Sequence, residues 1–149
     1  MVANRRAETT THWVSDKTDA DMPPFRSPSG EWAVSFNGVI ANDDRLRAEL
    51  GIHDAPTQID AWTIGAVLDA LGWDEGIRRL EGSIAIVAAN RSHPGRLWVA
   101  CNYQPLYERG APDQRLLEVA SQATYLDHGS LADRLVRPAA FQIPPYSIG

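Results

Sequence analysis

The stretch from Trp32 to Asp44, WAVSFNGVIANDD, places the strongest constraint on the fold, because it changes from a strand pattern to a helix pattern within a few residues. Trp32, Val34 and Phe36 recur at a period of two, which predicts a strand over residues 33–36 with one face buried. The Asn-Asp-Asp run at 42–44 supplies a capping Asn and an acidic first turn, which predicts a short helix over residues 43–50.

Asn37 and Gly38 lie where these two patterns meet. An Asn-Gly pair after an apolar run usually forms a hairpin turn, because both residues tolerate a positive φ. A returning strand would have to be very short here, since the helix signal begins at Asn42. The pair is therefore expected at a corner between a strand and a helix, with a hairpin turn as the alternative.

Length and composition predict one globular domain without a metal site or a nucleic-acid surface. The 149 residues are 44% hydrophobic, enough for an ordinary core, and carry a net charge of −5. Such an acidic chain offers no basic surface to nucleic acid. The four His residues and the single Cys101 lack the spacing of metal ligands, so no metal or other cofactor is expected. Without a long apolar run or a signal peptide, the expected location is the cytoplasm, with no membrane partner.

The rest of the chain predicts two further helical segments followed by a sheet. Helical spacing of apolar residues follows Asp60 and ends at Gly72, and a second helical segment runs from Asp74 to Gly82. The apolar run at 83–89 predicts a central strand covered on both faces. Strands at 97–102 and 116–120 are expected to continue it as a meander, with a turn at 108–114. Segment 141–148, which contains two Pro residues, is expected to be an edge strand or an extended tail.

Several segments, in this order, resemble the glutamine amidotransferase domain of the N-terminal-nucleophile hydrolases. They are FNGVIAND at 36–43, the Asp that opens the helix in TQIDAWTIGAVL at 57–68, the strands in SIAIVAANRSHPGRLWVACNYQPLY at 83–107, and EVASQATYL at 118–126. Arg6 and Thr9 also have the Arg-to-Thr spacing of that family. The resemblance covers most of the chain. It implies an α+β fold, an incomplete αββα sandwich of mainly antiparallel sheets with two or three helices, in a single domain of residues 1–149 that is truncated at its N-terminus.

The resemblance implies that the chain binds glutamine and releases ammonia from the side-chain amide. Attack on that amide places negative charge on its carbonyl oxygen, which the Asn37 side-chain N–H and the Gly38 backbone N–H would stabilise. Free glutamine also needs a cation for its α-carboxylate and an anion for its α-ammonium group. Arg6, with Thr9, and Asp60 would supply these. Arg5 stays open as an alternative to Arg6, and Asp60 taken alone is more often a helix cap.

The nucleophile is the part of this chemistry that the printed chain lacks. In the family it is a Cys at the first position of the mature chain, whereas this chain begins Met1-Val2. Cys101 is predicted to lie within a strand, without the free amine that activates the family's Cys, and is expected to be a buried structural thiol. Two functions therefore stay open. One is an amidotransferase that supplies ammonia to a partner synthase, with the nucleophile encoded upstream or in another chain. The other is a catalytically inactive binding module with the same fold. The ammonia acceptor is also left open.

Overall fold

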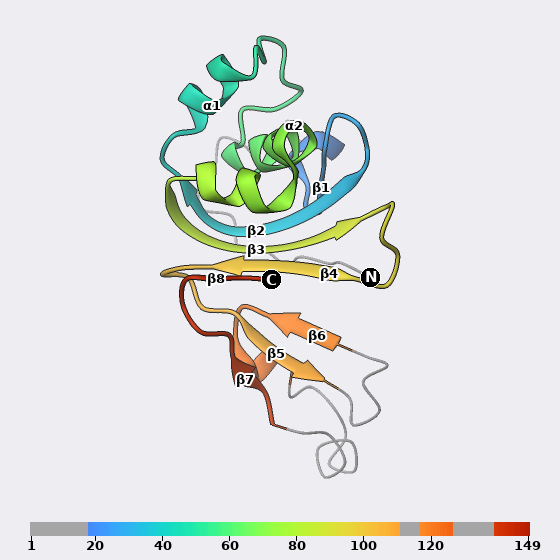
Figure 1. Ribbon diagram of the computed structural model, residues 1–149, viewed down its shortest axis with the longest axis vertical. Helices are drawn as coiled ribbons and strands as arrows, with labels where there is room; N and C mark the ends of the chain where they lie inside the picture. The colour runs from blue at the N-terminus through green and yellow to red at the C-terminus, as the bar shows by residue number, and fades with distance from the viewer. Residues whose placement is uncertain (1–17, 111–116, 127–138) are drawn as a thin grey trace.

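In a computed structural model, which describes residues 18–110, 117–126 and 139–149, the chain has a mixed α+β fold (Figure 1). The described residues form a five-stranded antiparallel sheet in the order β1-β2-β3-β4-β8 and a three-stranded antiparallel sheet in the order β6-β5-β7. Helix α2 packs on one side of the five-stranded sheet, and the smaller sheet lies on the other side. These features confirm the predicted α+β class with antiparallel sheets and helices.

The elements have the following bounds. The larger sheet consists of β1 (Phe25–Arg26), β2 (Trp32–Ile40), β3 (Gly82–Asn90), β4 (Leu97–Cys101) and β8 (Ser147–Ile148). The smaller sheet consists of β5 (Tyr107–Gly110), β6 (Leu117–Ala120) and β7 (Phe141–Gln142). The helices are α1 (Asp43–Glu49), α2 (Asp60–Arg79) and α3 (Ala123–Leu126), and a 3-10 turn, η2, spans Asp19–Asp21.

Strand β2 continues through Asn37 and Gly38 and ends at Ile40, so the predicted corner at the Asn-Gly pair is wrong. Its register with β3 is unbroken from Trp32, opposite Asn90, to the end of the strand, which also excludes the hairpin alternative. The strand can continue because Gly38 has no side chain to obstruct the close approach of β3. The chain instead leaves the sheet after Ile40 and enters α1. The helix predicted over residues 43–50 is confirmed.

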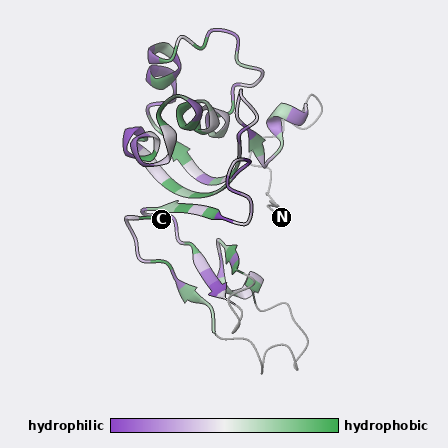
Figure 2. Cartoon of the chain, turned by 45° about the vertical axis from the view of Figure 1, so that its right-hand side comes forward, coloured by the Kyte–Doolittle hydropathy of each residue, from purple (hydrophilic) through white to green (hydrophobic). Residues whose placement is uncertain are grey.

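The main core lies between the larger sheet and α2. The apolar face of β2 that the sequence predicted is confirmed, because Val34 is fully buried against α2 residues that include Ile64 and Val67. Hydrophobic residues recur along the strands of this sheet (Figure 2). Burying one such side chain stabilises the fold by about 1.5 to 3 kcal/mol. Helix α2 is interrupted at Gly72, which has a φ of 74°, so the predicted break between two helical segments is present within this element.

The smaller sheet departs from the predicted meander. Strands β3 and β4 pair as expected, but β6 pairs with β5 rather than continuing from β4. Strand β5 includes Glu108–Gly110, which the sequence pattern assigned to a turn. An ion pair between the buried Arg109 and the partly exposed Glu118, with a 2.8 Å nitrogen–oxygen distance, joins β5 to β6, and local sequence does not reveal this pairing. The C-terminal segment forms the edge strands β7 and β8, as predicted for a segment with two Pro residues.

Asn42 joins the β2–α1 connection to the end of α2. It occupies the N-cap position of α1 as predicted, but its side chain does not cap that helix. Its Nδ2 donates to the Arg79 carbonyl oxygen at 2.8 Å, and its Oδ1 accepts from the Glu81 N–H at 3.0 Å. Asn42 is 6% exposed, so the Asn42 side of both hydrogen bonds is shielded from water. The Asn42 side chain therefore connects the start of α1 to the end of α2.

Replacing Asn42 by Ala should lower the free energy of unfolding by about 2 to 4 kcal/mol, because two backbone groups lose a buried partner. Urea denaturation measures this change. Asn90→Ala is the matched control, since Asn90 bonds to the N–H of Ser92 in an exposed turn; its cost should stay below about 1 kcal/mol. Equal losses in the two variants would contradict the role given to Asn42.

Candidate functional site

Gly38 occupies a position that only glycine fits. Its φ of 142° is a backbone conformation that residues with a side chain rarely adopt. A Cβ atom built at this position would overlap the carbonyl oxygen of Ser83 on β3. The presence of Gly after Asn37 therefore reflects the close packing of two strands.

The N–H of Gly38 points away from β3. At the end of the strand, the N–H of Ala41 donates to Glu81 on the β3 side, whereas the N–H of Ile40 donates to Asp60 on the other side. Backbone polar groups alternate between the two edges of a strand, and the register of β2 is unbroken. Gly38 and Ile40 therefore direct their N–H groups to the same edge.

This edge of β2 is covered by β1 over only part of its length. Strand β1 pairs opposite Val34 and Ala33, so the part of β2 that contains Gly38 extends beyond it, and within residues 18–110, 117–126 and 139–149 no other strand pairs with this edge. An uncovered strand edge presents N–H groups that can bind an oxygen of another molecule. The Gly38 N–H is directed outward from this edge, away from β3.

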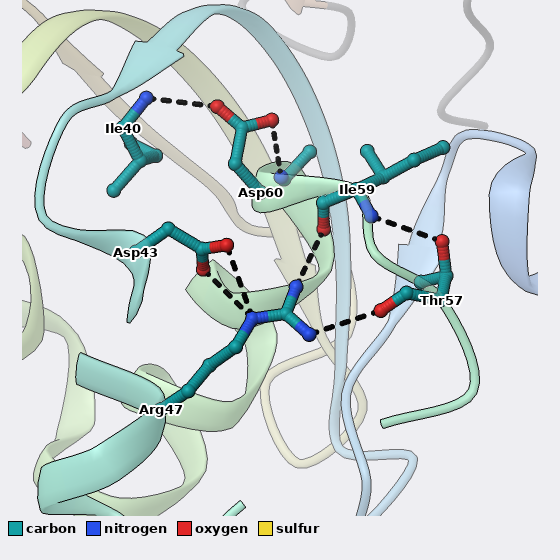
Figure 3. Close-up of polar contacts among 7 residues, drawn as sticks. Ile40, Asp43, Arg47, Thr57, Ile59 and Asp60 are labelled. Carbon is teal, nitrogen blue, oxygen red and sulfur yellow. Dashed lines mark hydrogen bonds and ion pairs between the residues drawn. The ribbon is translucent and has the colours of Figure 1, made fainter. Parts of the chain in front are cut away.

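Asp60 is the first residue of α2, and its carboxylate is held by two backbone groups (Figure 3). One carboxylate oxygen accepts from the Ile40 N–H and the other from the Ala61 N–H, each at 2.8 Å. A carboxylate accepts about four hydrogen bonds, so it retains capacity for a further donor. Its place at the N-terminus of a long helix also favours the negative charge. The predicted helix start at Asp60 is confirmed.

Gly38 and Asp60 are thus brought to one edge of β2. Ile40 connects the two residues. Its N–H donates to Asp60, and it lies two residues along β2 from Gly38. Two residues of a strand span roughly 6.6 Å. The edge therefore carries a backbone hydrogen-bond donor and, beyond the next N–H on the same side, an anionic group.

Asn37 projects from the opposite face of the sheet to α2. Neighbouring side chains of a strand alternate in direction, and those of Val34 and Ile40 pack on the α2 side. Asn37 is correspondingly exposed. The Asn37 side chain and the Gly38 N–H leave the strand in different directions. One oxygen atom of a bound molecule could accept from both only if it lay beside this edge of β2, on the face of the sheet away from α2.

The other residues proposed from the sequence cannot be placed at this edge. Arg5, Arg6 and Thr9 lie outside the described residues. Cys101 is 3% exposed, as expected for a structural thiol, and burial raises the pKa of its thiol. In the sheet Ala85 lies between Cys101 and Asn37, which puts the two roughly 10 Å apart. A nucleophile attacks from about 3 to 3.5 Å, so Cys101 is not placed to act here.

Sequence reasoning missed one residue next to this site, Arg47. It is 9% exposed, and its guanidinium binds the segment that leads to Asp60. The signal that could have indicated it is the spacing of four residues between Asp43 and Arg47, which places opposite charges on one face of a helix. That spacing is common on exposed helix surfaces and does not by itself predict burial.

Within residues 18–110, 117–126 and 139–149, no group of three or more His, Cys, Asp or Glu side chains is arranged to hold a metal ion. No helix in these same ranges has the length and apolar character needed to cross a membrane.

Comparison with known proteins identifies the family. The family model described as "Glutamine amidotransferase domain" matches residues 8–128, which is most of the chain. The chain belongs to the glutamine amidotransferase domain family. This assignment confirms the resemblance given by the FNGVIAND segment and Asp60.

Curated relatives of this amidotransferase domain are longer proteins. The chain is 30% identical over 155 residues to 7-cyano-7-deazaguanine synthase 2 of Sulfurisphaera tokodaii, a match that covers 99% of this chain and 32% of the relative. It is 34% identical over 146 residues to glutamine–fructose-6-phosphate aminotransferase (isomerizing) of Idiomarina loihiensis, covering 83% of this chain and 23% of the relative. The chain thus spans about a third or less of the length of these relatives.

Solved structures of amidotransferases share the fold. The glutamine phosphoribosylpyrophosphate amidotransferase of B. subtilis, in complex with ADP and GMP, superimposes with a TM-score of 0.64 at 19% sequence identity. The match covers 85% of this chain and 29% of that one. At this identity the similarity supports the arrangement of strands and helices, and it agrees with the α+β fold expected for this class.

Substituting Gly38 in the amidotransferase domain should destabilise it strongly. Gly38→Ala adds backbone strain and an overlap with Ser83, which together should cost about 2 to 6 kcal/mol. Gly51→Ala is the matched control, because Gly51 also has a positive φ but has open space around it, and it should cost about 1 to 2 kcal/mol. Thermal and urea unfolding measure both. A Gly38 variant as stable as the Gly51 variant would show that β3 does not approach this closely.

Proposed function

We propose that this single domain binds glutamine at the open edge of β2 and promotes hydrolysis of its side-chain amide, and that the ammonia released passes to a synthase. The observation that carries the proposal is the hydrogen bond from the Ile40 N–H to Asp60. It holds a carboxylate at the edge to which the Gly38 N–H also points.

In this proposal each end of glutamine has its own partner. Asp60 accepts hydrogen bonds from the α-ammonium group through the capacity its carboxylate retains. The α-carboxylate binds Arg6, with Thr9 beside it, as the family resemblance implies, and Arg5 is the alternative cation. The side-chain carbonyl oxygen lies between the Gly38 N–H and the Asn37 side-chain N–H. This arrangement selects an amino acid by its α-carboxylate and α-ammonium charges, and it places the side-chain amide at the open edge.

The reaction proceeds by addition to the amide carbon. A nucleophile forms a bond to that carbon while the C=O π electrons move to oxygen, and Asn37 and Gly38 stabilise the resulting oxyanion. Collapse of this intermediate re-forms the C=O bond and breaks the C–N bond, and the nitrogen takes up the proton that the nucleophile gave up and leaves as ammonia. Water then hydrolyses the acyl group to give glutamate. Loss of one oxyanion donor typically costs about 10²- to 10³-fold in rate.

We assign the nucleophile to a Cys at the start of the mature domain, supplied by an upstream-encoded segment or by another chain, because Cys101 is buried and distant from the edge. An inactive glutamine-binding module is the alternative, and it would bind glutamine without ever releasing ammonia. Co-expression with a Cys-initiated upstream segment separates the two. Ammonia release that Asp60→Ala abolishes supports the enzyme, and binding without release supports the binding module.

The acceptor of the ammonia is proposed to be a synthase domain or subunit. Relatives that match nearly the whole chain are named as synthases of 7-cyano-7-deazaguanine, a base whose cyano group carries a nitrogen atom. A nitrile-forming synthase is therefore the first acceptor to test, ahead of an aminotransferase that acts on a sugar phosphate, the role in the name of other relatives.

Asp60→Asn should weaken binding of L-glutamine about 10- to 100-fold, because a hydrogen-bonded charge pair with the α-ammonium group is lost. Isothermal titration calorimetry on the full chain measures the dissociation constant. Glutaramate, which is glutamine without its α-amino group, should bind the variant and the original protein equally.

Asp44→Asn is the matched control for this prediction. It removes the same charge from an exposed position in the first turn of α1 and should leave glutamine binding unchanged. If Asp60→Asn binds glutamine as tightly as the original protein, or if glutaramate binding falls to the same degree, Asp60 is not the partner of the ammonium group.

A further inference from the structure

We infer that Arg47 is a positioning residue for glutamine recognition, which sets the place of Asp60 and thereby the selectivity for a substrate with an α-ammonium group. The inference rests on the proposed function of Asp60. It assigns to Arg47 no contact with glutamine itself, because each of its three guanidinium nitrogens already donates to a protein group.

The guanidinium of Arg47 joins three parts of the chain (Figure 3). Its Nε lies 3.0 Å from both carboxylate oxygens of Asp43, within α1. One terminal nitrogen donates to the Thr57 carbonyl oxygen at 3.0 Å, and the other donates to the Ile59 carbonyl oxygen at 3.1 Å. Each nitrogen of the planar group thus has a separate acceptor.

Both carbonyl groups belong to the three residues that precede Asp60. The Ile59 carbonyl is part of the peptide bond to Asp60, and it also accepts from the Trp62 N–H at 3.1 Å in the first turn of α2. The Cζ atom of Arg47 lies 5.8 Å from the centre of the Trp62 ring, within the range of a cation–π contact. Arg47 therefore fixes the start of α2 from the side of α1.

A second set of bonds holds the same segment. The Thr57 hydroxyl oxygen accepts from the Ile59 N–H at 3.1 Å, and the hydroxyl bonds to Asp21 of η2. The two carboxylate oxygens of Asp60 are already held by backbone N–H groups at Ile40 and Ala61. Residues 57–59 thus set the position from which the Asp60 carboxylate reaches the Ile40 N–H of β2.

The positive charge of Arg47 is balanced by the neighbouring Asp43 carboxylate. The side chains of Arg47 and Asp43 are 11% and 17% exposed, so the pair is largely shielded from water. An unpaired buried cation close to Asp60 would oppose the binding of an ammonium group, whereas a paired one opposes it much less. The arrangement therefore positions Asp60 without neutralising its attraction for the substrate.

Lys cannot reproduce this arrangement. An ammonium group is a point charge without the planar fork of a guanidinium, so it cannot serve Asp43 and two divergent carbonyl groups together. Arg47→Lys keeps the charge and much of the apolar stem. It should therefore preserve the fold while loosening the segment before Asp60.

The test measures two ligands on the full chain. Arg47→Lys should weaken L-glutamine binding about 10-fold while leaving glutaramate binding within about 2-fold, since only the ammonium contact depends on Asp60. In the Asp60→Asn background the same change should have no further effect. Arg45→Lys is the matched control on α1, because Arg45 is half exposed and pairs with Glu81 at the surface; it should change neither affinity.

Hydrogen exchange separates this inference from the proposed function. Arg47→Lys should accelerate exchange of the Ile40 N–H at least about 10-fold, because its acceptor Asp60 is no longer fixed, while the N–H of Val87 in β3 stays protected. Failure of the original protein to bind glutamine would overturn the proposed function, yet this exchange result would still test the role of Arg47. Unchanged Ile40 exchange, or equal losses for both ligands, would overturn the inference.

Discussion

The hydrogen bond from the Ile40 N–H to the Asp60 carboxylate is the contact on which the candidate site depends. It joins the last residue of β2 to the first residue of α2, two positions that lie 20 residues apart in sequence. Without it, the edge of β2 beyond β1 would present only backbone groups, and Asp60 would be an ordinary acidic residue at a helix start. With it, a fixed negative charge lies at the same edge of β2 as the Gly38 N–H.

Much of this arrangement follows from local sequence patterns, and the rest depends on tertiary contacts. The period-two pattern of Trp32, Val34 and Phe36 predicted the buried face of β2, and apolar spacing predicted the start of α2 at Asp60. The course of the chain at Gly38 could not be predicted in the same way. A Gly in a strand weakens local propensity, and only the approach of Ser83 on β3 explains why the strand continues through it.

The residues missed by sequence reasoning are buried Arg side chains with partners that lie 9 to 12 residues away along the chain. Arg47 has the pattern of a solvated helix surface, yet its acceptors at Thr57 and Ile59 are 10 and 12 residues away. Arg109 lies in a segment with the composition of a turn, and its pairing with Glu118 stabilises β5 against β6. A buried charge costs several kcal/mol unless it is paired, so such residues are placed by the fold and not by local propensity.

The central claim is that glutamine lies along the open edge of β2 between Gly38 and Asp60. Two-dimensional NMR of the full chain during titration with L-glutamine tests it most directly, because each backbone N–H reports on its own surroundings. The account predicts that the largest shifts occur at the N–H groups of Gly38, Ile40 and Ala61, with small shifts at β4. Saturable shifts centred elsewhere, or none at millimolar glutamine, would contradict it.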